Sequence, residues 1–185
     1  MKKIIQLSSV ILLIVGVIGF FIYRSSHAYR SSHASPSSST ISMTNVVVYE
    51  GLPHPAWEPQ LLESEIKSKK TVKMDGFYFY EARLNPNTNE LKLIVDSLKN
   101  PALYQKYVGA KACGGFHPDF AVTWENNDRI VTALICFGCS EIKIDEADYH
   151  GHFDLAHNEE FRSTLQRIAI NRPPFQKISP LELNR

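Results

Sequence analysis

The stretch FAVTWENNDRIVTALICFGCSEIKI, residues 120–144, decides the fold. It holds three runs rich in β-branched and aromatic residues, at 120–124, 129–137 and 140–144. A four-residue polar segment separates the first two runs, and only Gly138 and Cys139 separate the second from the third. Connections this short join antiparallel neighbours, because parallel strands need a long crossover. The stretch therefore predicts a three-strand antiparallel meander in the C-terminal half.

Shorter elements surround this meander. Asp75-Gly76 stands between two β-rich runs and predicts a tight hairpin. Asn87 and Glu90 have the spacing of a capping box, and an apolar stripe with helical period follows them. A buried strand is expected at 45–50, and further helices at about 59–69 and 158–170. The expected class is α+β: an antiparallel sheet packed with three to four short helices.

The N-terminal segment predicts export. Residues 4–23 carry no charge, and as a helix they would cover about 30 Å of hydrocarbon. One interpretation is an uncleaved signal anchor over residues 1–23, which would be a transmembrane helix with its N-terminus in the cytoplasm. The other is a cleavable signal peptide, since Ser26 and Ala28 are small residues at the spacing of a cleavage site. The anchor is preferred because the apolar run is long for a signal peptide and Arg24 follows it directly.

A tether follows the apolar segment. The hexamer Tyr-Arg-Ser-Ser-His-Ala occurs twice in tandem, at 23–28 and 29–34. A repeat this short buries nothing, and its serine-rich composition predicts a flexible tether over 24–43. Residues 44–185 then form one extracytoplasmic α+β domain on a single-pass anchor in the cytoplasmic membrane. The domain would be secreted if the signal were cut.

The charge distribution argues against nucleic acid as a partner. The whole chain has a net charge of +1, but residues 1–43 hold four basic side chains and no acidic one. The rest carries 16 basic and 19 acidic side chains, without a long basic run. A mildly acidic domain of this kind lacks the positive surface that binds phosphates. The expected partners are the membrane, through residues 4–23, and an unknown protein or small molecule.

Two of the three cysteines form a Cys-x-x-Cys motif, Cys136-Phe137-Gly138-Cys139. A thioredoxin-type pair needs a helix that begins at the motif and lowers the thiol pKa. The residues that follow Cys139 have a β pattern, so the oxidoreductase hypothesis lacks its physical basis. The pattern fits a hairpin with Phe137-Gly138 as its two-residue turn. Cys136 and Cys139 would then face each other about 5.5 Å apart at their Cα atoms, within disulfide range.

The third cysteine opens an alternative. Cys113 and His117 stand four apart in a glycine-rich loop, and with Cys136 and Cys139 they make a Cys3His set. Such a set suits tetrahedral zinc. Export favours a disulfide with one cysteine left over, and both possibilities stay open. A nucleophilic Cys113 with His117 and Asp119 is the weakest hypothesis, because nothing places them as nucleophile and base.

Other polar residues are weaker candidates. His54 and Glu58 are either ligands or a pair that fixes a loop. Glu141, beside the cysteine motif, is expected to be an exposed strand residue. The motif His150-Gly151-His152 is expected to lie in a solvated loop, although together with His157 it could bind copper or zinc.

Four blocks of the sequence carry a resemblance: EGLPH (50–54), GFYFY (76–80), CGGFHPD (113–119) and CFGCSE (136–141). Together they resemble a group of small exported bacterial proteins of unknown function, in which the same blocks recur in this order. The resemblance covers roughly residues 46–145 and implies no activity. It implies that one site unites His54, Cys113, His117, Asp119, Cys136, Cys139 and Glu141.

The sequence thus favours a membrane-anchored, non-enzymatic binding or structural module. Its Cys/His cluster would fix a loop against a β-hairpin, by zinc or by a disulfide. The alternative is an extracytoplasmic enzyme that depends on a thiol or on a metal. An enzyme needs a reactive thiolate or an open ligand position, whereas a structural site is closed and inert.

Overall fold

The computed structural model describes residues 45–126, 128–146 and 149–173. The predicted anchor at 1–23 and the tether at 24–43 lie outside these residues. Within the part of the chain that is described, no helix is both long enough and apolar enough to cross a membrane.

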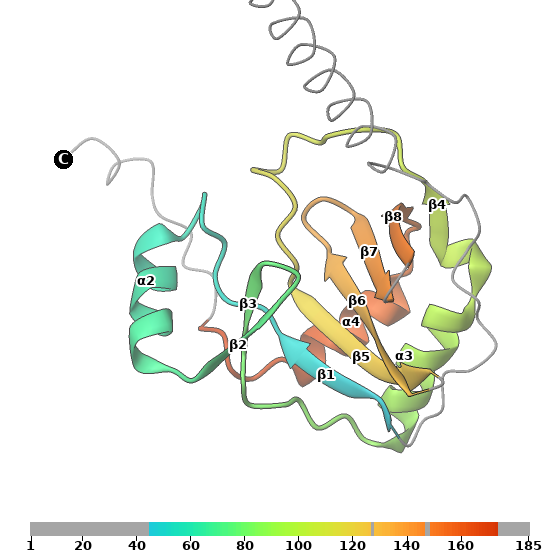
Figure 1. Cartoon of the computed structure of the whole chain (residues 1–185), viewed down its shortest axis with the longest axis horizontal. Helices are drawn as coiled ribbons and strands as arrows, with labels where there is room; N and C mark the ends of the chain where they lie inside the picture. The colour runs from blue at the N-terminus through green and yellow to red at the C-terminus, as the bar shows by residue number, and fades with distance from the viewer. Residues whose placement is uncertain (1–44, 127, 147–148, 174–185) are drawn as a thin grey trace, which may run out of the picture. The chain divides into compact units, whose positions relative to one another are not determined.

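A six-stranded antiparallel sheet forms the centre of the fold, with the strand order β1-β5-β6-β7-β8-β4 (Figure 1). Its strands are β1 (Val47–Glu50), β4 (Tyr104–Lys106), β5 (Phe120–Asn126), β6 (Arg129–Cys136), β7 (Glu141–Glu146) and β8 (Tyr149–Leu155). The predicted meander is confirmed as β5-β6-β7. The structure extends it by β8, which sequence reasoning missed because polar and glycine residues interrupt its β pattern.

A separate hairpin, β2 (Thr71–Met74) and β3 (Phe77–Tyr80), is confirmed as predicted. Its turn residues Asp75 and Gly76 both have positive φ, 44° and 85°. That combination matches the type I′ turn that Asp-Gly favours. A bridge from Phe79 to Gly51 joins the hairpin to the chain just after β1.

Among the described residues, three α-helices and one short 3₁₀ helix complete the α+β class that the sequence predicts. They are α2 (Pro59–Ser68), α3 (Thr88–Lys99), η3 (Pro101–Leu103) and α4 (Glu159–Ile168). The capping box at the start of α3 is confirmed, since the Asn87 and Glu90 side chains each accept a backbone N–H of the other residue. The Asn158 side chain caps α4 by accepting the Phe161 N–H.

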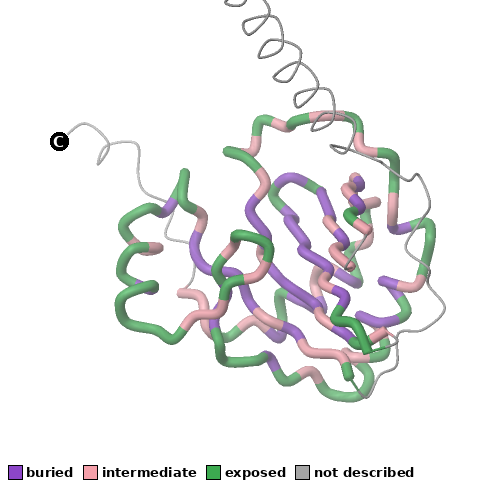
Figure 2. The backbone as a smooth tube through the Cα atoms, in the orientation of Figure 1, coloured by how far each residue is buried: buried purple, intermediate pink, exposed green. Residues whose placement is uncertain are grey.

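Helices α3 and α4 cover one face of the sheet, and most of the core lies there (Figure 1). Strand alternation sends Phe120, Val122 and Trp124 of β5 into this core. Ala121 points the other way and packs with Leu134 and Phe79 of the hairpin. Figure 2 shows the central strands buried and α2 mostly exposed.

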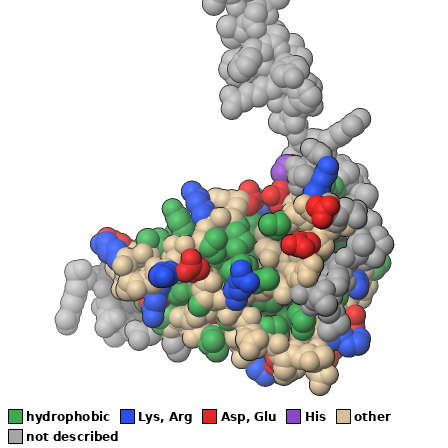
Figure 3. Space-filling view, turned by 60° about the horizontal axis from the view of Figure 1, so that its bottom comes forward, with side chains coloured by type: hydrophobic (Ala, Val, Ile, Leu, Met, Phe, Trp, Pro, Cys, Tyr) green, Lys and Arg blue, Asp and Glu red, His purple; other side chains and the backbone are tan. Residues whose placement is uncertain are grey.

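The second face of the sheet is only partly covered, by the β2–β3 hairpin and by residues 107–119, which we call the cover loop; Ile130 on this face is 68% exposed. Phe116 of this loop packs on the hairpin side, next to Phe77. On the surface drawn in Figure 3, basic and acidic side chains lie interspersed, with hydrophobic side chains between them. Most of the residues that the sequence singled out lie in this loop, or in the strands and the turn next to it.

Candidate functional site

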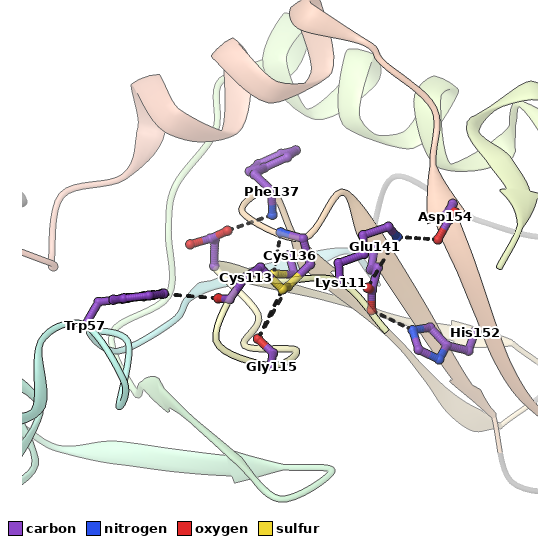
Figure 4. The surroundings of a disulfide bond; sticks show 11 residues. Trp57, Lys111, Cys113, Gly115, Cys136, Phe137, Glu141, His152 and Asp154 are labelled. Carbon is purple, nitrogen blue, oxygen red and sulfur yellow. Dashed lines mark hydrogen bonds and ion pairs between the residues drawn. A yellow bond between two sulfur atoms is a disulfide. The ribbon is translucent and has the colours of Figure 1, made fainter. Parts of the chain in front are cut away.

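A disulfide joins the cover loop to the turn between β6 and β7 (Figure 4). It links Cys113 to Cys139, whose Cα atoms lie 5.4 Å apart. The predicted pairing of Cys136 with Cys139 is therefore wrong. Cys136 is the last residue of β6 and pairs with Glu141 across the ladder, so the turn has four residues instead of two. Cys139 sits within that turn and bonds to the loop.

The structure favours the disulfide over the zinc alternative, since the bond takes two of the three thiolates that a Cys3His site needs. Among the described residues, no three His, Cys, Asp or Glu side chains come together in a way that could hold a metal ion. Cys136 keeps a free, buried thiol whose sulfur accepts the Cys139 N–H at 3.3 Å. Burial raises the pKa of this thiol, which disfavours the reactive thiolate.

Two further contacts fasten the cover loop. At its end, the Asp119 N–H donates to Ile135 O at 2.7 Å, and Asp119 Oδ2 accepts the Phe137 N–H at 2.8 Å. Near its start, Lys111 forms ion pairs with Asp154 and, at 3.3 Å, with Glu141. The loop is thus held at both sides of the disulfide.

Glu141 is buried, with 3% of its surface exposed, and the expectation of an exposed strand residue is wrong. Strand alternation puts it on the face that the cover loop covers. Its second oxygen lies 2.8 Å from Nε2 of His152, and the His152 ring stacks on Tyr107 of the loop at 3.9 Å between centroids. His152 lies in β8 and not in a solvated loop, so the expectation for this histidine is wrong too.

A cleft of about 240 Å³ lies beside the disulfide. It is lined by His54, Trp57, Glu58, Cys113, His117, Asp119, Cys136, Gly138, Cys139 and Arg172. Six of the seven residues that the resemblance assigns to one site therefore line a single cleft. Glu141 does not, and belongs to the neighbouring ion-pair network under the cover loop.

Two neutral histidines lie next to each other in the lining of this cleft. The ring centroids of His54 and His117 lie 4.8 Å apart. Burial lowers the pKa of both rings, and that of His117 falls to about 4. Nδ1 of His54 accepts the Ala56 N–H at 3.0 Å, so the neutral ring carries its proton on Nε2. His54 Nε2 and His117 Nδ1 are buried, and neither forms a hydrogen bond of normal geometry within the described residues, although the Gly115 backbone lies close enough to His54 to oppose the lowering of its pKa.

Arg172 places a fixed cation at the cleft. Its guanidinium pairs with Glu58 and, at 3.4 Å, with Asp119. The backbone that carries it is anchored by Glu50, a buried carboxylate that accepts the N–H groups of residues 170, 171 and 172. Oε1 of Glu58 keeps no partner in the described part of the chain, although the residue is only 7% exposed.

Trp57 forms the rim of the cleft, with 57% of its surface exposed. Its indole N–H donates to the Cys113 carbonyl at 3.2 Å, which ties the ring to the disulfide-bonded loop (Figure 4). Sequence reasoning missed Trp57 and Arg172 as site residues. The EGLPHPAWE segment contains Trp57, so proximity to His54 could have indicated it, whereas Arg172 carries no local signal.

Comparison with protein family models, curated proteins and solved structures finds no match for this chain.

Proposed function

We propose that this protein is a non-enzymatic binding module, held outside the cytoplasmic membrane by its N-terminal segment. It would bind a small ligand in the cleft beside the Cys113–Cys139 disulfide. The observation that carries the proposal is the set of three buried polar atoms without partners, on His54, Glu58 and His117, in one cleft. Buried polar groups are normally satisfied, and such exceptions point to a ligand or to water.

The fastening of the cleft supports binding by a preformed site. The disulfide, the Lys111 ion pairs and the Asp119 hydrogen bonds each hold a different part of the cover loop. Because the cover loop is held in this way, it loses little conformational freedom when a ligand binds in the cleft. The raised pKa of the Cys136 thiol speaks against the alternative of a thiol-dependent enzyme.

Ligand-observed NMR on the full-length protein in phospholipid nanodiscs tests this proposal. The probes are four classes of small molecules: neutral sugars, carboxylic acids, amino acids and polyamines. We expect at least one class to give saturable binding that is lost in the double variant Cys113→Ala/Cys139→Ala. If no class binds, or if binding survives the loss of the disulfide unchanged, the cleft is not a ligand site.

A further inference from the structure

The chemistry of the cleft restricts the class of ligand that it can bind. This inference rests on the binding function proposed above. We propose that the cleft binds a neutral, polyhydroxylated ligand of the size of one sugar ring. Three features carry this assignment: the balance of charge in the cleft, the mixture of free donors and acceptors, and the tethered indole at its rim.

Charge disfavours an anionic ligand. Arg172 is the one cation among the lining residues of the cleft, because both histidines are neutral near pH 7. Its guanidinium is already shared between Glu58 and Asp119. A carboxylate or phosphate would therefore meet two acidic side chains and no unpaired positive group.

A cationic ligand fits no better. His54 presents an N–H at Nε2, because its Nδ1 already accepts a backbone hydrogen bond. An ammonium group cannot accept that hydrogen bond. A metal ion is disfavoured for the same reason, and the described residues offer no group of three ligands.

A hydroxyl group satisfies these atoms, because it donates one hydrogen bond and accepts others. It can donate to Oε1 of Glu58 and accept from Nε2 of His54, the two partnerless atoms whose roles are fixed. Nδ1 of His117 suits a hydroxyl in either tautomer. A ligand with several hydroxyls can therefore meet all three atoms at once.

Trp57 supplies the apolar surface that a sugar ring needs on its C–H face. The indole is exposed, and its N–H bond to the Cys113 carbonyl fixes the ring at the rim of the cleft. The volume of about 240 Å³ suits one ring and not a longer chain. A sugar would lie with one face on the indole and with its hydroxyls towards the histidines and Glu58.

Titration of the full-length protein in nanodiscs tests this assignment, since sugar-headed detergents would compete. The probes are D-glucose, D-galactose, D-mannose and N-acetyl-D-glucosamine, with gluconate and glucosamine as charged counterparts. We expect at least one neutral sugar to bind saturably and its charged counterparts to bind about tenfold or more weakly. Glu58→Gln and Trp57→Ala should each weaken binding about tenfold, the effect of losing one charged hydrogen bond or an equivalent contact.

Glu63→Gln is the matched control, since Glu63 is an exposed residue of the nearby helix α2 and lies outside the cleft. It should leave sugar binding unchanged. The proposal is overturned if no neutral sugar binds, if the charged counterparts bind as well, or if both cleft variants bind like the wild type. If another class of ligand bound and sugars did not, only the sugar assignment would be overturned. The proposed binding function would stand. The wild-type panel decides the question even if a variant fails to fold.

Discussion

At the scale of single residues, Gly114 allows the cover loop to close on Trp57 and His54. It has a φ of +83°, and an added Cβ would lie 2.9 Å from Nε1 of Trp57 and 3.0 Å from Cε1 of His54. Gly115 has a similar φ of +93°, but a Cβ there meets nothing within 4 Å. A comparison of substitutions at the two glycines therefore separates the cost of backbone strain from the cost of a steric clash.

We predict that Gly114→Ala lowers the free energy of unfolding more than Gly115→Ala does. Gly115→Ala should cost about 1–2 kcal/mol from the left-handed backbone conformation. Gly114→Ala should cost about 1–3 kcal/mol beyond that, from overpacking against the two rings. Urea unfolding of both variants measures the difference. Equal losses would mean that the loop moves away from Trp57 without cost.

His117 gives the cleft a pH dependence. Its pKa falls to about 4 in the folded protein, chiefly because burial disfavours the charged ring, against about 6.5 when unfolded. The unfolded chain therefore binds the proton first as pH falls, and the stability present above about pH 6.5 is lost towards pH 4. The lowered pKa of His54 acts in the same direction, and the raised pKa of Asp119 in the opposite one.

We predict that the stability difference between wild type and His117→Gln changes by about 3 kcal/mol between about pH 7.5 and pH 4. The wild type loses more, because glutamine does not titrate. Urea unfolding at a series of pH values checks this, and the comparison cancels the contributions of groups that do not interact with His117. Parallel curves for the two proteins would show that His117 is readily protonated in the folded state.

At the scale of elements, the disulfide connects a loop to a turn that the sheet alone would not hold together. Cys113 and Cys139 are 26 residues apart in the chain. A cross-link that closes a loop of that length in the unfolded state stabilises the fold by about 3.5 kcal/mol. Cys136 makes no such link, although it lies at the end of β6 directly before the same turn.

We predict that Cys113→Ala/Cys139→Ala lowers the free energy of unfolding by about 2–4 kcal/mol. Cys136→Ala keeps the disulfide and should cost only about 1 kcal/mol, as a small buried substitution. Thermal unfolding with and without reductant checks both values. The reduced wild type should then approach the stability of the double variant. A larger loss for Cys136→Ala than for the double variant would indicate that the buried Cys136 thiol contributes more to stability than the disulfide does.

The sequence predicted elements well where the pattern was local. The meander, the Asp-Gly hairpin and the Asn87 capping box depend on residues close in the chain, and all three are confirmed. The disulfide pairing, the burial of Glu141 and the role of Arg172 depend on long-range contacts. Residue 113 meets residue 139 only because the cover loop folds over the sheet, which no local spacing encodes.

At the scale of the whole molecule, the cleft needs both ends of the described chain. Glu50 is the last residue of β1, near the start, and its carboxylate holds residues 170–172, which are about 120 positions away. Arg172 then reaches Glu58 and Asp119. The site therefore forms only when the sheet, the cover loop and the last segment are all in place.

The proposed export explains how the Cys113–Cys139 disulfide beside the cleft would persist. Oxidising compartments allow disulfides to form, whereas the cytosol reduces them. We predict that the full-length protein, purified from membranes and denatured, shows one titratable thiol and no bound zinc. A form lacking residues 1–43, made in a reducing cytosol, should show three thiols and a lower melting temperature. Oxidation of that form should restore both the single thiol and the higher melting temperature. Three thiols and one bound zinc in the membrane-purified protein would contradict the disulfide. That result would support the Cys3His zinc site instead.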